Sequence, residues 1–178
     1  SPYAEGFRHS WKITNGNHML TMNDLVGSNA VATWTDPSNP SDIISFSIDK
    51  PNKINRLTDV NKDIFYNVEF GEVEEITYKS VDEKYVQGWI VKPPNFDSNK
   101  KYPLVLRIHG GPHSMYHVGF NYNFQLHAAQ DQVVLYTNPR GSTGYGYDFA
   151  NAIQNAYPGN DYDDIMSVSY THLTLPTT

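Results

Sequence analysis

The sequence predicts a chain in two parts, a β-rich first part and an α/β second part built around parallel strands. Two observations carry this prediction. Residues 1–70 contain short apolar segments that alternate with turn formers about every ten residues, which is typical of sandwiches, barrels and propellers. Residues 102–147 contain two apolar runs that each end at a glycine-bearing loop, with a helical pattern between them.

The first part is expected to contain five short strands. Stretches rich in Gly, Pro, Asn and Asp interrupt them and predict turns at 15–17, 36–40 and 49–53. The expected strands are Phe7–Ile13, His18–Asn23, Ala30–Thr35, Ile43–Ile48 and Ile54–Leu57. This pattern fits a generic β-meander as well as one blade of a propeller, which cannot bury both its faces alone.

A β-hairpin is expected next. The segments EEITYKS (74–80) and YVQGWIVK (85–92) alternate apolar and polar residues on either side of a short polar turn. The stretch that follows, 93–101, is rich in Pro, Asn and Asp and should form an exposed loop. We place the boundary between the two parts near Glu72.

The second part is organised around one strand–helix–strand unit. Leu104–Ile108 and Val133–Tyr136 are short apolar runs typical of buried strands. Between them, Phe120–Asp131 is long enough for a helix and carries apolar residues at every fourth position. Such a unit gives parallel strands joined by a right-handed crossover. Because ligands bind beyond the carboxyl ends of parallel strands, both glycine loops are candidate site segments.

Two further helices are expected after the second loop. The first has an apolar face from Phe149 to Ala156 and ends at Pro158-Gly159, and the second begins at Asn160 or Asp161. The final run VSYTHLTLPTT (168–178) does not continue this helix, because it holds four threonines within eight residues and a proline. We interpret it as a non-native tail translated from a sequencing adapter, with a genuine C-terminal tail as the alternative.

The motifs at the two strand ends resemble those of a known enzyme family. The first loop reads HGGPH (109–113), and HGG after a strand and before a helix resembles the oxyanion loop of α/β-hydrolases. Together with LYTNPRGSTGYG (135–146), it is similar to the prolyl oligopeptidase family of serine peptidases, most of all its acylaminoacyl-peptidase and dipeptidyl-peptidase-like branch. The resemblance implies the N-terminal half of an α/β-hydrolase sheet, preceded by the last strands of a β-propeller.

This resemblance gives the expected domain organisation and function. Residues 1–71 would be the C-terminal part of a β-propeller, residues 72–167 the N-terminal half of the peptidase domain, and residues 168–178 the non-native tail. The intact protein is expected to hydrolyse short peptides through an acyl-enzyme. A carboxylesterase of the same fold and a non-catalytic β-rich binding module are the alternatives.

The catalytic Ser, Asp and His implied by the resemblance are expected downstream of the chain end, because no G-x-S-x-G occurs in the sequence. Ser142 follows a strand, but its motif has the wrong spacing, so this truncated chain is expected to be inactive. The chain would supply the oxyanion loop, with the Gly111 N–H as donor, Gly110 shaping the turn and His109 orienting the loop. A turn that needs glycine only for its backbone geometry is the alternative.

Arg140 and Tyr116 are candidates for lining the substrate cleft. For Arg140 the alternative is a carboxylate partner that holds the loop, and for Tyr116 it is packing in the core. His109, His113 and His117 recur at a spacing of four, but the glycines and proline between them prevent a helix, so no metal site is predicted. The resemblance implies no cofactor.

Composition limits the possible partners. The net charge is −6 and no basic stripe is present, so nucleic acid is not expected as a partner. No apolar stretch approaches membrane-spanning length. The absence of cysteine leaves the compartment open between cytoplasmic and periplasmic or secreted, and the oligomeric state cannot be read from the sequence.

Overall fold

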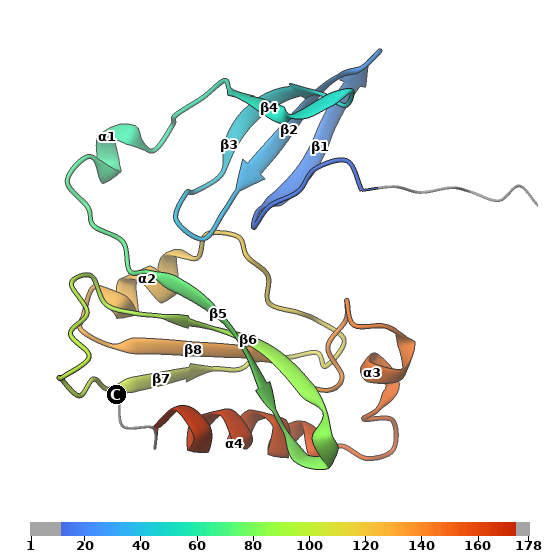
Figure 1. Cartoon of the computed structure of the whole chain (residues 1–178), viewed down its shortest axis with the longest axis vertical. Helices are drawn as coiled ribbons and strands as arrows, with labels where there is room; N and C mark the ends of the chain where they lie inside the picture. The colour runs from blue at the N-terminus through green and yellow to red at the C-terminus, as the bar shows by residue number, and fades with distance from the viewer. Residues whose placement is uncertain (1–11, 174–178) are drawn as a thin grey trace, which may run out of the picture.

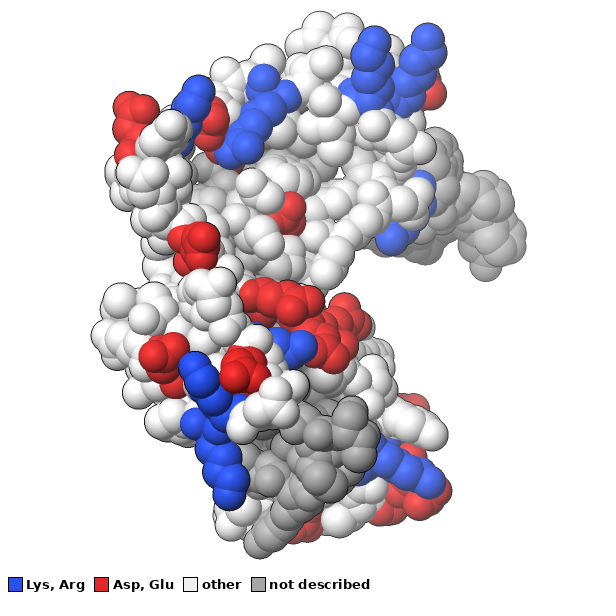
Figure 2. Space-filling view, turned by 60° about the vertical axis from the view of Figure 1, so that its left-hand side comes forward, with Lys and Arg blue, Asp and Glu red and all other residues white. Residues whose placement is uncertain are grey.

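The computed structural model describes residues 12–173, and it places two four-stranded sheets one above the other (Figure 1). Sheet A has the strand order β1-β2-β3-β4, and sheet B has the order β5-β6-β8-β7. Figure 2 shows the two sheets as two lobes with a hollow between them on one side. The strand predicted at Phe7–Ile13 lies outside the described residues except for its last two, which are not in a strand.

Sheet A is an antiparallel meander, which confirms four of the five strands predicted in this region. Its strands are β1 (Met19–Val26), β2 (Asn29–Thr35), β3 (Asp42–Ser47) and β4 (Lys50–Arg56). Ala30 and Ala32 of β2 pack with Ile44 and Phe46 of β3 in a small core. The outer strands β1 and β4 are mostly exposed, so the inner two strands carry the packing of this sheet.

The turn predicted at 49–53 is wrong over most of its length. Strand β4 begins at Lys50, which pairs with Ser47 across a two-residue connection. Pro51 therefore lies inside a strand. It is tolerated there because β4 is an edge strand of the described sheet, where a residue without an N–H costs no ladder hydrogen bond.

Asp42, at the start of β3, ties sheet A to the segment that leaves it. Its carboxylate accepts hydrogen bonds from Thr58 Oγ1 at 2.6 Å, from Val60 N at 3.1 Å and from Arg56 Nε at 3.0 Å. Burial alone would raise the pKa of Asp42, but the hydrogen bonds from Thr58 and Arg56 outweigh it and lower this pKa below its ordinary value.

We expect acid to destabilise sheet A through Asp42. Since the folded pKa is lowered, the carboxylate stabilises the fold above the unfolded pKa of about 3.9 and loses this contribution as pH falls below it. Circular dichroism between pH 5 and pH 2 should show this acid transition weakened in Asp42→Asn. Asp49→Asn, at an exposed position of the neighbouring turn, is the control and should leave the transition unchanged. Identical curves for both variants would contradict the assignment.

An aromatic cluster joins the linker after sheet A to the segment before α2 (Tyr122–Ala128). The linker contains the short helix α1 (Lys62–Phe65). The rings of Phe65 and Phe70 lie 5.0 Å apart, and Phe70 meets Phe120 edge-on at 4.9 Å. Phe120 also donates its backbone N–H to Thr35 Oγ1 of β2. The segment before α2 thus packs on the linker and is hydrogen-bonded to β2 of sheet A.

Gln125 of α2 holds the end of the linker. Its buried carboxamide accepts from Gly71 N at 2.7 Å and donates to Gly71 O at 3.0 Å. A Cβ on Gly71 would lie 2.1 Å from Lys92 O, so this position accepts only glycine without a shift of the backbone.

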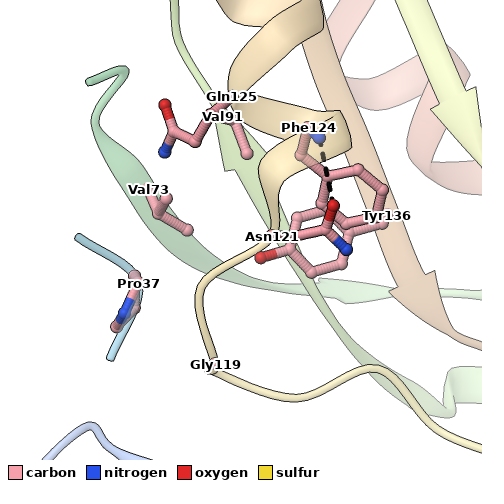
Figure 3. Close-up of a pocket in the computed structure, with 8 residues that line it drawn as sticks. All are labelled: Pro37, Val73, Val91, Gly119, Asn121, Phe124, Gln125 and Tyr136. Carbon is pink, nitrogen blue, oxygen red and sulfur yellow. Dashed lines mark hydrogen bonds between the residues drawn. The ribbon is translucent and has the colours of Figure 1, made fainter. Parts of the chain in front are cut away.

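Sheet B contains the predicted hairpin and the predicted parallel pair. Its strands are β5 (Val73–Lys79), β6 (Tyr85–Val91), β7 (Leu104–Arg107) and β8 (Val133–Asn138), with the 3₁₀ turn η1 (Val81–Glu83) between β5 and β6. Strands β7 and β8 are parallel neighbours, and α2 connects them, which confirms the strand–helix–strand unit. Asn121 caps α2 by accepting from Phe124 N, the hydrogen bond drawn in Figure 3.

Helices cover both faces of sheet B (Figure 1). Val134 and Tyr136 of β8 pack with Phe124 and Ala128 of α2 on one face. Leu135, between them in sequence, packs on the opposite face in the cluster that includes Val168 of α4 (Asn160–Leu173). The alternating side chains of β8 thus pack against α2 on one face of sheet B and against α4 on the other.

The two helices after β8 differ in how well they were predicted. Helix α4 begins at Asn160, as expected. The helix expected from Phe149 to Ala156 is wrong in extent, because α3 spans only Tyr147–Asn151. Turns follow it, and Asn155 has a left-handed φ of 58°, which a continuous helix does not allow.

Candidate oxyanion site at the ends of two parallel strands

The loop after β7 presents two unpaired backbone donors. Gly110 and Gly111 are exposed, and within the described residues neither N–H has a hydrogen-bond acceptor. Gly111 has φ of 70°, a conformation that side chains disfavour, and nothing lies within 4 Å of a Cβ built on either glycine. The loop therefore leaves space for a group from outside to approach these donors.

The loop after β8 lies against the first loop and supports it. His113 Nδ1 lies 3.2 Å from Gly141 O, and Thr143 N donates to Ser114 O at 2.9 Å. His109 Nε2 lies 2.9 Å from Ser142 Oγ. The two segments singled out from the sequence are thus brought together, as their position at neighbouring parallel strands predicts.

His109 donates to Ser142. The Ser142 hydroxyl donates to Pro139 O at 2.6 Å, so its oxygen is left to accept from His109 Nε2–H. Ser142 is fully buried and no substrate can reach it, which agrees with its unsuitable motif. This hydrogen bond orients His109 relative to the second loop.

Arg140 is buried rather than exposed in a cleft. Its backbone N and its Nε donate to Asp164 Oδ2, at 2.8 and 3.0 Å, and its Nη2 donates to Asp164 Oδ1 at 2.7 Å. Nη1 reaches both carboxylate oxygens of Asp82 in the β5–β6 turn. The hydrogen bonds that Arg140 donates to Asp164 raise the pKa of Arg140 above its ordinary value. The cleft-lining position suggested for Arg140 is not seen, and its partners make it an arginine that holds the loop.

Tyr116 packs against the core at the edge of the site. Its ring meets His109 at 5.3 Å and Tyr136 at 5.1 Å, both edge-on, and burial raises the pKa of its phenol. Tyr116 is only half-buried, and its ring contacts His109. The observed contacts of Tyr116 are therefore packing contacts within the loop and the core, and its place in a cleft wall stays a prediction.

Three residues of this region were not predicted as site residues from the sequence. Asn138 binds the main chain of Tyr116, and Asp82 and Asp164 bind Arg140. Asn138 carried one available signal, because it is a polar residue at the carboxyl end of a predicted parallel strand.

A small cavity beside sheet B is not this site. It has a volume of about 10 Å³, at the lower limit for one water molecule, and lies between Pro37 and α2 (Figure 3). In the part of the chain described, no group of three His, Asp or Glu side chains could hold a metal ion. No helix among residues 12–173 is long and apolar enough to cross a membrane.

Comparisons with known proteins agree with the motifs. Residues 118–174 match the model of the prolyl oligopeptidase family. The uncharacterized peptidase YuxL of Bacillus subtilis is 40% identical over 136 residues, which are 76% of this chain and 20% of that protein. Dipeptidyl-peptidase 4 of Giardia intestinalis is 37% identical over 163 residues, which are 86% of this chain and 20% of that protein.

A solved structure gives the same answer for the fold. The acylaminoacyl peptidase of Pyrococcus horikoshii matches with a TM-score of 0.79 and 28% identity. The match covers 91% of this chain and 26% of the peptidase chain. The chain spans about a fifth of the length of these curated relatives. Family match, peptidase relatives and fold agree, and the chain belongs to the prolyl oligopeptidase family.

Proposed function

We propose that the intact protein is a serine peptidase that cleaves short peptides through an acyl-enzyme, and that this chain supplies its oxyanion loop. The observation that carries the proposal is the exposed N–H of Gly111 in the loop after β7, which has no acceptor among the described residues. The triad Ser, Asp and His would come from sequence outside this chain. Its relatives are peptidases, and one solved acylaminoacyl peptidase is a complex with Z-Gly-Gly-Phe-chloromethyl ketone, a peptide-like ligand.

The chemistry explains why an unpaired backbone donor matters. When a nucleophile attacks a peptide carbonyl, the oxygen gains negative charge in the tetrahedral intermediate. A donor that already points at this oxygen lowers the barrier by about 2.7–4 kcal/mol. The glycines allow substrate to approach the backbone, because no Cβ stands in the way. His109 would act by orienting the loop through Ser142.

The proposed domain organisation assigns sheet A to the C-terminal part of a β-propeller, within residues 1–71, and sheet B with its helices to the first half of the peptidase domain. The likeness to the acylaminoacyl peptidase supports this, since it extends over 91% of the chain. The non-native origin of residues 168–178 stays a prediction. The family match extends into this segment, to residue 174, and α4 continues to Leu173. The DNA after the codon for Ser167, read in the source gene, decides it.

The function is tested on the complete protein encoded by the source gene. We expect it to hydrolyse short peptide p-nitroanilides and to be labelled by a fluorophosphonate that reacts with activated serines. The 178-residue chain alone should show no turnover, since loss of a triad nucleophile typically lowers kcat about a millionfold. Cleavage of p-nitrophenyl esters without cleavage of peptides would favour the carboxylesterase alternative. The absence of both hydrolytic activity and fluorophosphonate labelling would favour the binding-module alternative.

A further inference from the structure

Asn138, the last residue of β8, uses its whole carboxamide to hold the first loop. Its Oδ1 accepts from Tyr116 N at 2.7 Å, and its Nδ2 donates to Tyr116 O at 3.0 Å. The second Nδ2 hydrogen goes to the Tyr145 hydroxyl at 2.7 Å. The side chain therefore pairs with the main chain of Tyr116 as a neighbouring strand would, and Asn138 is completely buried.

A chain of hydrogen bonds fixes which way this carboxamide points. The Tyr145 hydroxyl donates to Gln87 Oε1, and Gln87 Nε2 donates to Glu75. Burial raises the pKa of Tyr145, so the phenol keeps its proton. Because this proton goes to Gln87, the phenol oxygen acts as acceptor toward Asn138. Reversing the carboxamide would set its NH₂ against the N–H of Tyr116, so only one orientation satisfies all partners.

The hold on Tyr116 adds to the contacts that His109, His113 and Ser114 make with the loop after β8, and it fixes the C-terminal end of the first loop. Gly110 and Gly111 are exposed and unpaired within the described residues, so their position depends on how the rest of the loop and its two ends are held. One end is β7. At the other end, the Tyr116 ring packs edge-on against His109, which connects the anchored backbone to the residue that precedes the glycines.

We propose that Asn138 is a positioning residue for the oxyanion loop: it fixes the main chain of Tyr116 and thereby holds residues 109–116 in the conformation that presents the Gly111 N–H. The inference rests on the proposed function, because a loop position matters for turnover only if Gly111 acts in catalysis. The fold alone needs no carboxamide here, since β8 already pairs with β6 and β7.

The variant Asn138→Asp distinguishes the effect of the carboxamide donors from the effect of side-chain size. Aspartate has the same shape, but an oxygen replaces the NH₂ group. This oxygen cannot donate to Tyr116 O or to the Tyr145 hydroxyl. The matched control is Asn123→Asp, the same change at an exposed position of α2. Tyr145→Phe is a milder second variant, since it removes the phenol that fixes the carboxamide and leaves Asn138 in place.

The experiment uses the complete protein and two measurements. We expect Asn138→Asp to lower kcat for a peptide anilide about 100-fold with KM within about threefold, because the loop is misplaced while binding contacts remain. Hydrogen exchange should rise about tenfold in peptides covering 109–118 and stay unchanged in β6 and β8. Tyr145→Phe should change both measurements in the same direction by less, and Asn123→Asp should change neither.

The outcomes separate the inference from the function on which it rests. An active wild type with unchanged loop exchange in Asn138→Asp overturns the inference alone. If Asn138→Asp unfolds the protein, Tyr145→Phe decides, and unchanged kcat and exchange in that variant overturn the inference. A wild type without peptidase activity overturns the proposed function and, with it, the catalytic role of this loop position.

Discussion

Asp164→Asn should lower the free energy of unfolding by about 3 kcal/mol, the cost of removing one partner from a buried ion pair. The Asp164 side chain is fully buried, and three hydrogen bonds from Arg140 and one from Ser80 Oγ end on its carboxylate. Without this charge, Arg140 stays buried with only the half-exposed Asp82 as a carboxylate partner. Urea unfolding followed by tryptophan fluorescence measures the change.

Asp163→Asn is the matched control, because it makes the same change one residue earlier on α4. No hydrogen bond among the described residues involves the Asp163 carboxylate, so its replacement should change the free energy of unfolding by no more than about 0.5 kcal/mol. Equal effects of the two variants would mean that the Arg140–Asp164 pair contributes nothing beyond the charge of the helix.

The parts of the fold that were predicted depend on local sequence. The alternation in EEITYKS and YVQGWIVK gave the hairpin of β5 and β6, and the apolar runs ending at glycines gave β7 and β8. The β4 strand was partly missed because Pro51 and Asn52 are turn formers, and only their place at a sheet edge makes them compatible with a strand.

The site divides in the same way. Gly110 and Gly111 were predicted because an exposed turn at a strand end needs glycine locally, and the structure places them there. The partners of Arg140 could not be predicted, since Asp82 and Asp164 are 58 and 24 residues away in sequence. Asn138 could be noticed as a polar residue at a strand end, but its partner could not be predicted, because it binds the main chain of Tyr116 and every residue type offers the same backbone oxygen.

Gly111→Ala should lower kcat of the complete protein about 100-fold, close to the loss of one oxyanion donor. At φ of 70° an added Cβ costs about 1 kcal/mol, so the backbone is expected to relax and turn the N–H away from the substrate carbonyl. The space around Gly111 is open, which excludes a steric clash with the rest of the described chain as the cause. Steady-state kinetics with a peptide anilide measures the effect.

Gly27→Ala gives the control that this interpretation needs. Gly27 connects β1 and β2, has φ of 60° and also has nothing within 4 Å of an added Cβ. Both variants should therefore lose about 1 kcal/mol of stability from the same backbone strain, and only Gly111→Ala should lose turnover. If both variants keep the wild-type kcat, the Gly111 N–H is not an oxyanion donor, and glycine is present in this loop only because the turn requires its backbone conformation.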